Sequence, residues 1–341
     1  MIDQDNLFEK LNRLRFGVEE ENLRAFVEQS MPMIREIEEL KKERDAVVLA
    51  HSYVPPIIIY SVADFVGDSY GLSKDALNAT QKTIVFAAVK FMGETAKILN
   101  PGKDVLIPGD EPGCTLADSI TGADVRALRT RHPDHTFVCY INTTADVKAE
   151  CDVCVTSSNV YDIVERIEND KILFLPDRLM GRNLIEEMAL RGVEKDIRLT
   201  DGSCYVHEEF DPAIVPKLKD AYPDLYVMAH PECRPEVVRQ ADYVGSTSQM
   251  FNVIKGMETG RNYLMLTECG LVSRIEAEMP GRNFVGTCQL CKYMKSNRLE
   301  GIRRVLAEPR DEDYVRIAPE VIERARTCVD AMFRYAEQAS R

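Results

Sequence analysis

Residues 45–53 read DAVVLAHSY, an apolar, β-branched run that stops abruptly at the polar residues His51 and Tyr53. Two later stretches repeat this pattern, HTFVCYINTT at 135–144 and DLYVMAHPE at 224–232. Short runs of this kind, each followed by a helix-like segment, are typical of buried strands in parallel sheets. Their polar ends at 51, 142 and 230 lie about ninety residues apart, so the chain contains an internal repeat.

Each repeat contains two further apolar runs with similarly polar ends. The second runs are TIVFAAVKF (83–91), DVCVTSSN (152–159) and DYVGSTSQM (242–250), and the third runs are DVLIPGD (104–110), KILFLPD (171–177) and NYLMLTE (262–268). This order predicts an α/β fold made of three similar three-layer αβα domains, each a strand–helix–strand–helix–strand unit with a parallel sheet.

The repeat also predicts the domain boundaries. Residues 1–125 should hold N-terminal helices and the first unit, 126–215 the second unit and 216–310 the third. Residues 311–341 should form a C-terminal helix that packs back on the core. Helical spacing covers the first 45 residues, with an interruption expected near Pro32.

Polar residues stand where the predicted strands end. Ligands of open parallel sheets gather at the carboxyl ends of the strands, where helix N-termini also point. Three matching sets of strand ends therefore predict one site shared at the centre of the three units. The residues at these ends are His51, Tyr53, Tyr140, Asn142, Ser157, His230, Glu232, Ser246 and Thr247.

One cysteine in each unit follows the last predicted strand. These are Cys114 in GDEPGCTLADS, Cys204 in LTDGSCYVHEE and Cys291 in TCQLCKYM. Thiolates are soft ligands that select zinc, copper(I) or iron–sulfur clusters. A four-iron cluster held by three cysteines leaves one iron open, and such an iron can act as a Lewis acid in a dehydration.

A second interpretation is a non-catalytic zinc or redox module. It would combine the C-x-x-C pairs Cys151/Cys154 and Cys288/Cys291, a spacing found in structural zinc sites. Against it, Cys151 and Cys154 flank the start of an apolar strand, so one or both should turn into the core. Cys139 and Cys328 also lie in apolar surroundings and are predicted to be core residues.

The bulk composition restricts the class of protein. The chain has 341 residues, 45% of them hydrophobic, and a formal charge of −13. An acidic chain attracts neither nucleic acid nor an anionic membrane at long range. It has no apolar run long enough to span a bilayer and no signal-peptide pattern at its start, so we expect a cytoplasmic protein.

From about residue 46 to 336 the chain resembles the quinolinate synthase family, enzymes of NAD biosynthesis. The resemblance is carried, in order, by the motifs LAHSY, ADFVGDS, GETAKILNP, PGCTLADS, YINTTADVKA, VTSSN, FLPDRLMGRN, CYVHEEF, AHPEC, VGSTSQM and CKYMKSN. It implies three αβα domains around a pseudo-threefold axis with the active site at the centre. It also implies that iminoaspartate condenses with dihydroxyacetone phosphate to quinolinate, with loss of phosphate and two waters.

The resemblance assigns roles to individual residues. It implies a four-iron, four-sulfur cluster on Cys114, Cys204 and Cys291, with the open iron as Lewis acid in the dehydration. Tyr53, Tyr140, His230 and Glu232 would handle protons, and Tyr140, His230 and Glu232 would also contact substrate. Carboxylates and phosphate would be bound by His51, Ser69, Asn142, Ser157, Ser246 and Thr247. The expected partners are the two substrates and, transiently, the oxidase that produces iminoaspartate, but no nucleic acid or membrane.

Some stretches depart from the family pattern or leave alternatives open. The apolar VPPIIIYS (54–61) stands where the family carries acidic and glutamine residues, and Lys292 stands where proline is frequent. His207 is either a neighbour of the cluster ligands or a surface residue. Cys288 is either a bystander or a thiol that forms a disulfide with Cys291 and switches the cluster off under oxidation.

Overall fold

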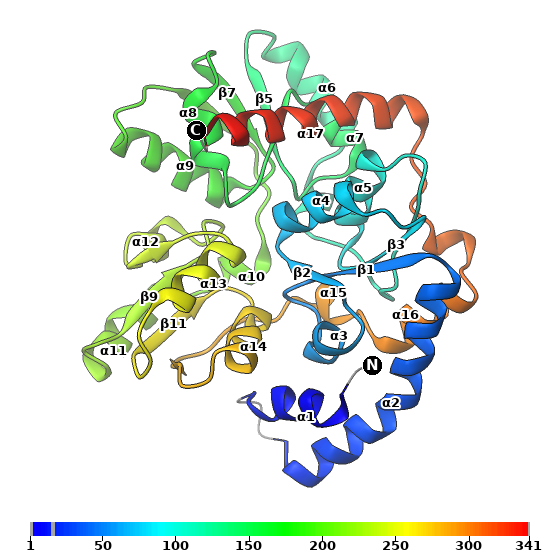
Figure 1. Cartoon of the computed structure of the whole chain (residues 1–341). Helices are drawn as coiled ribbons and strands as arrows, with labels where there is room; N and C mark the ends of the chain where they lie inside the picture. Colours follow the sequence, from blue (N-terminus) through cyan, green and yellow to red (C-terminus); the bar gives the residue numbers. More distant parts are fainter. Residues whose placement is uncertain (1–2, 15–17, 340–341) are drawn as a thin grey trace.

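The computed structural model describes residues 3–14 and 18–339, and it contains three four-stranded parallel sheets (Figure 1). Their orders are β2-β1-β3-β4, β6-β5-β7-β8 and β10-β9-β11-β12, so each unit repeats the order 2-1-3-4. The strands are β1 (Ala46–His51), β2 (Phe65–Gly67), β3 (Thr83–Ala87), β4 (Asp104–Leu106), β5 (Thr136–Tyr140), β6 (Val153–Val155), β7 (Lys171–Leu175), β8 (Asp196–Leu199), β9 (Tyr226–Ala229), β10 (Tyr243–Val244), β11 (Asn262–Leu266) and β12 (Asn283–Phe284).

The predicted fold class is confirmed, but each unit has four strands instead of three. The run at 83–91 is β3, the third strand of its unit, and it is therefore equivalent to β7 and β11. The sequence did not indicate β2, β8 or β12, because β2 and β12 have only three and two residues and β8 is partly exposed along its length. Each of the three cysteines still follows the last strand of its unit.

Helices repeat in step with the strands. The helix before the first strand of each unit is α2 (Glu20–Glu43), α6 (Gly122–Arg131) or α11 (Ile214–Ala221). The first strand of each unit is followed by α3 (Pro56–Ser61), α7 (Ala145–Lys148) or α12 (Pro235–Val238). The second strand is followed by α4 (Ser69–Asn78), α8 (Val160–Arg166) or α13 (Thr247–Gly256). The third strand is followed by α5 (Lys90–Leu99), α9 (Arg178–Leu190) or α14 (Cys269–Glu278). Short α10 (Tyr205–Glu208) and α15 (Lys292–Lys295) begin directly after Cys204 and Cys291. The carboxyl ends of all three sheets therefore lead into helices.

The N-terminal helices differ from prediction at Pro32. Helix α2 runs without interruption through Pro32, so the expected break there was wrong. Pro32 and Glu28 are both exposed, so water can satisfy the Glu28 carbonyl that lost its amide donor. Helix α1 (Gln4–Asn12) packs against α3 and α14, and so covers the atypical apolar segment that forms α3.

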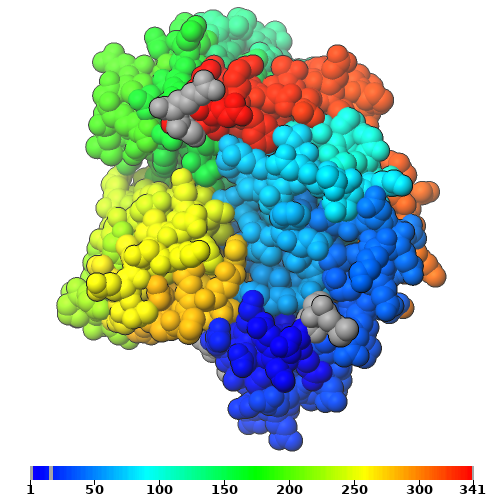
Figure 2. Space-filling view, in the orientation of Figure 1, coloured from blue at the N-terminus to red at the C-terminus, as the bar shows by residue number. Residues whose placement is uncertain are grey.

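Two helices at the end of the chain return to the first two units. Helix α16 (Leu299–Ala307) packs against α2 and β3, while α17 (Pro319–Ala339) contacts β6, α7, α8 and α5. Figure 2 shows α17 lying across the face formed by these two units. The exact domain boundaries stay a prediction. Among the described helices, none is both long enough and apolar enough to span a membrane.

Candidate active site

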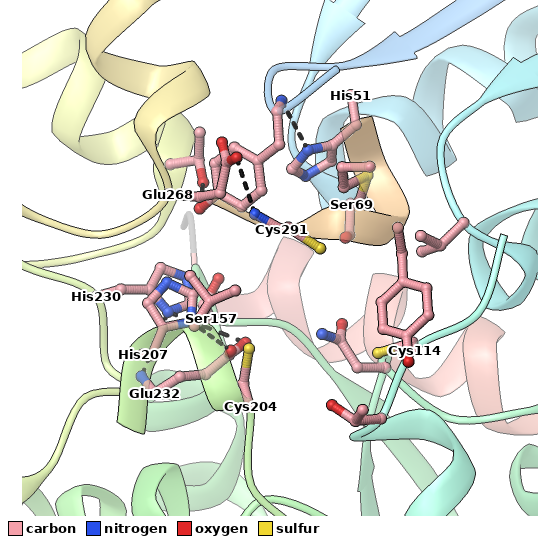
Figure 3. A pocket seen from close by; sticks show the side chains of 18 of the residues that line it. His51, Ser69, Cys114, Ser157, Cys204, His207, His230, Glu232, Glu268 and Cys291 are labelled. Atoms are coloured by element: carbon pink, nitrogen blue, oxygen red, sulfur yellow. Dashed lines mark hydrogen bonds and ion pairs between the residues drawn. The ribbon is translucent and has the colours of Figure 1, made fainter. Parts of the chain in front are cut away.

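One cavity lies where the carboxyl ends of the three sheets meet (Figure 3). Every predicted site residue except Ser246 lines it. These are His51, Tyr53, Ser69, Cys114, Tyr140, Asn142, Ser157, Cys204, His230, Glu232, Thr247 and Cys291. The structure thus brings together residues that lie up to 240 positions apart in the chain.

The first strands of units one and three end in the same local structure. His51 Nδ1 accepts the backbone N–H of Tyr53 at 3.2 Å, and His230 Nδ1 accepts that of Glu232 at 3.3 Å. Burial lowers the pKa of His51 to about 4 and that of His230 to about 3, so both rings are neutral near pH 7. A neutral ring whose Nδ1 is an acceptor carries its proton on Nε2. Each histidine can therefore donate one hydrogen bond from Nε2.

A chain of hydrogen bonds connects Tyr140 and Tyr53, two of the tyrosines that line the cavity. The Tyr140 hydroxyl donates to Glu232 Oε1, and Glu232 Oε2 lies 2.8 Å from Nδ1 of His207. His207 Nε2 lies 3.1 Å from Thr267 Oγ1, which in turn lies 3.0 Å from the Tyr53 hydroxyl. His207 is buried and stacks on His230, with ring centroids 4.4 Å apart. The structure therefore supports the first alternative for His207, a neighbour of the predicted cluster ligands, and not a surface position.

The charge states along this chain suit acid–base chemistry. Burial alone would raise the pKa of Glu232, but electrostatic interactions with His207 and His230 and the hydrogen bonds from His207 and Tyr140 lower it to about 2. Burial raises the pKa of both Tyr53 and Tyr140. Near pH 7 Glu232 is therefore an ionised carboxylate next to phenols that keep their protons.

Ser246 has a structural role that the sequence did not reveal. It caps α13 through Gln249, and its hydroxyl donates to Asp68 Oδ2 at 3.0 Å. Asp68 also caps α4 through the N–H of Gly71. This carboxylate joins the starts of two helices from different units, and it holds Ser69 and Thr247, the first residues of those helices, at the cavity wall.

A second buried carboxylate joins the Tyr53 loop to the Cys291 loop. Glu268, two residues after β11, accepts the N–H of Cys291 at 3.1 Å and pairs with Lys295 Nζ at 3.0 Å. Lys295 also donates to the backbone carbonyl of Tyr53 at 2.5 Å. Glu268 is fully buried and lines the cavity. Sequence reasoning missed this pair.

Gly270 lies at the same junction, and replacing it by alanine should be destabilising. A Cβ there would lie 2.6 Å from Tyr53 Cα and 2.7 Å from the carbonyl of Ser52, both backbone atoms that cannot rotate away. We expect Gly270→Ala to lower the free energy of unfolding by about 1–3 kcal/mol, measured by urea denaturation. Gly102→Ala, with open space around its Cβ, is the control. Equal stability of the two variants would contradict this packing.

The neutral histidines predict how stability depends on pH. Because the native pKa values of His51 and His230 lie below the ordinary 6.5, the unfolded chain binds more protons as the pH falls from 6.5. The contribution of the two neutral histidines to the free energy of unfolding is complete above pH 6.5. Below pH 6.5 it falls by about 1.4 kcal/mol per pH unit for each histidine. The loss through Glu232 begins only below its ordinary pKa of 4.5.

Urea denaturation between pH 7 and pH 5 should therefore show a falling free energy of unfolding. His51→Asn keeps an acceptor for the Tyr53 N–H but does not titrate, so its slope should be about half that of the wild type. A flat profile in the wild type would contradict the neutral, buried state of these rings.

The three predicted ligand thiols open onto the same space (Figure 3). Burial raises the pKa of Cys114 to about 12, and it also raises those of Cys204 and Cys291. Within the described residues, the one compact group of metal-binding side chains with ligand atoms all within 4.8 Å is Cys204, His207 and Glu232. Cys114 and Cys291 are not part of that group, although both line the same cavity.

The remaining cysteines correct two sequence-based interpretations. Cys288 is bonded to Cys269, not to Cys291, so the hypothesis of a Cys288–Cys291 disulfide is wrong in this structure. Cys269 is the first residue of α14, and this bond fixes the loop before Cys291 to that helix. A signal for this pairing was absent from the sequence, because the two residues belong to different elements 19 positions apart.

The zinc interpretation also fails. Cys151 and Cys154 are buried in unit two, where both interact with the thiol of Cys139. Cys139 and Cys328 are fully buried with their sulfur atoms 3.6 Å apart, which confirms the prediction that both are core residues. The two C-x-x-C pairs therefore do not form one site.

A family model and similar curated proteins point to the same family. The family model for quinolinate synthetase A proteins matches residues 35–334. A quinolinate synthase from Sinorhizobium fredii is 45% identical over 301 residues, which cover 88% of this chain and 82% of that protein. One from Caulobacter vibrioides is 40% identical over 305 residues (88% and 81%), and quinolinate synthase 1 from Mesorhizobium japonicum is 44% identical over 293 residues (86% and 88%). The chain belongs to the quinolinate synthetase A family.

Proposed function

We propose that this chain is a transferase that condenses iminoaspartate with dihydroxyacetone phosphate to give quinolinate, phosphate and two waters, as a step of NAD biosynthesis. The observation that carries the proposal is one cavity that combines three thiols, the ionised carboxylate of Glu232 and hydrogen-bond donors from all three units. Membership of the quinolinate synthetase A family supports the same reaction.

Hydrogen-bond donors would bind the anionic groups of the substrates. Both substrates are anions, so their oxygens require donors. His51 and His230 can each donate from Nε2, as argued above. Ser69 and Thr247 begin helices α4 and α13, where backbone N–H groups add to the hydroxyls. Asn142 and Ser157 supply donors from unit two.

Glu232 and the two tyrosines would move protons. The condensation removes protons from carbon and nitrogen and adds them to leaving hydroxyl groups. The Glu232 carboxylate is the base in the cavity, and Tyr140, which already donates to it, can pass on a proton. His207 and Thr267 extend this path to Tyr53 on the opposite wall.

Cys114, Cys204 and Cys291 would hold a four-iron, four-sulfur cluster. When bound by three cysteines, such a cluster offers one open iron as a Lewis acid for the loss of a hydroxyl group. Glu268 fixes the backbone of Cys291, and α10 and α15 fix the residues that follow Cys204 and Cys291. We also propose a cytoplasmic location and transient contact with the oxidase that produces iminoaspartate.

An anaerobic assay tests the proposed reaction. The protein, reconstituted with iron and sulfide, is supplied with dihydroxyacetone phosphate and with iminoaspartate made in place from aspartate. We expect quinolinate and inorganic phosphate in equal amounts, measured by chromatography and by a phosphate assay. Leaving out either substrate is the control. Fully reconstituted protein that forms no quinolinate would overturn the proposal.

A further inference from the structure

The side chain of Lys148 is held by backbone and hydroxyl oxygens. Lys148 is the last residue of α7, and its side chain is fully buried. Its Nζ donates to the Ile141 carbonyl at 2.8 Å, to the Thr143 carbonyl, and to Thr143 Oγ1 at 3.3 Å. The Thr143 hydroxyl gives its one proton to the Tyr140 carbonyl, so Oγ1 must accept from Nζ. These three acceptors match the three N–H donors of a lysine ammonium group.

This charge is buried without an ion pair. Among the described residues, no carboxylate oxygen lies within 4.0 Å of Lys148 Nζ. Glu94 of α5 interacts electrostatically with Lys148 over a longer distance. Burial raises the pKa of Glu94, and the charge of Lys148 partly opposes that rise. The Glu94 carboxylate is already used, since it accepts the N–H of Ala145 at 2.8 Å. Carbonyl partners alone compensate poorly for a buried charge, so an anion near Lys148 would be stabilising.

The ammonium lies directly behind the cavity wall. The two carbonyls that it holds, those of Ile141 and Thr143, flank Asn142, which lines the cavity. Asn142 Oδ1 is buried without a hydrogen-bond partner and can only accept, so it is the amide N–H groups of this side chain that could donate to an oxyanion. Phe91, also in the wall, places its ring centroid 5.8 Å from Lys148 Nζ. Water does not reach the ammonium, so its field is little screened towards the cavity.

We propose that Lys148 is the buried cation of an oxyanion subsite on the unit-two wall of the cavity. It holds the Asn142 loop in place, and its charge attracts the phosphate or carboxylate group that Asn142 contacts. Lys148 acts through Asn142 and through its field, so it is a positioning residue and need not touch substrate. The identity of the oxyanion as a substrate group rests on the function proposed above.

Binding of two simple anions tests this inference without an activity assay. Inorganic phosphate and malate, titrated calorimetrically into the folded protein, represent the two possible sources of the oxyanion. We expect Lys148→Met to raise the dissociation constant of at least one of them on the order of tenfold or more. The anion that is affected identifies the substrate group. Glu94→Gln removes the opposing negative charge, keeps an acceptor for Ala145, and should tighten binding of the same anion.

Lys195→Met is the matched control. Lys195 is also a buried side chain of unit two that donates to backbone carbonyls, those of Ile167 and Asn169, but it pairs with Asp170 and lies outside the cavity lining. It should lose stability without losing anion affinity. Equal affinities in the wild type, Lys148→Met and Lys195→Met would overturn the inference. If Lys148→Met does not fold, unchanged affinity in Glu94→Gln would overturn it instead.

The same titration separates this inference from the proposed function. Wild-type protein that binds neither anion would contradict the proposed substrate class. Wild-type protein that binds one of them regardless of Lys148 and Glu94 would contradict only the role of Lys148.

Discussion

Replacing Cys291 by alanine is expected to abolish iron binding, visible absorbance and quinolinate formation together. The proposed cluster would need all three thiols, because no other described cysteine lines the cavity. Cys114→Ala and Cys204→Ala should have the same effect. Iron analysis and the visible spectrum of anaerobically prepared protein give the measurement.

Cys288→Ala is the control for the cysteine variants. Cys288 lies three residues before Cys291, but its sulfur is bonded to Cys269 and it does not line the cavity. This variant should keep its iron, although the loop before Cys291 loses its link to α14. Equal loss of iron in Cys288→Ala and Cys291→Ala would contradict the assignment of the ligands.

Replacing Glu232 by glutamine is expected to reduce kcat on the order of 10²- to 10⁴-fold while the iron content stays normal. The carboxylate accepts from both Tyr140 and His207, and a glutamine amide has only one oxygen for these two donors. Its nitrogen would face one of them and break the path between Tyr140 and His207. The base would also be lost.

Glu209→Gln is the control for this variant, because Glu209 is an exposed carboxylate of the same local segment as His207. It should leave kcat and KM unchanged. A Glu232→Gln variant with bound iron and a kcat near that of the wild type would show that Glu232 is not the base.

Much of the fold follows from local sequence patterns. Strands buried on both faces, such as β1 and β3, require continuous apolar runs, and these runs are visible without any structure. The strands that escaped prediction lie at the sheet edges. There a strand of two residues such as β12, or a half-exposed one such as β8, leaves no apolar run.

The site was predictable where it coincides with strand ends. Glu268 lies two residues after a recognisable strand, β11, and the same rule applied to third strands would have found it. Asp68 was missed because it follows the unrecognised strand β2. Lys295 and Thr267 both form hydrogen bonds with Tyr53, which lies in another unit. A single sequence does not reveal which distant residues come into contact.

We propose that three thiols from three units hold one iron–sulfur cluster in the cavity. The most direct test is metal analysis of wild-type protein purified without oxygen, together with its visible spectrum. The account predicts brown protein with about four iron ions per chain and a broad absorbance in the blue. Colourless protein with about one zinc ion per chain, and no iron uptake on reconstitution, would contradict it.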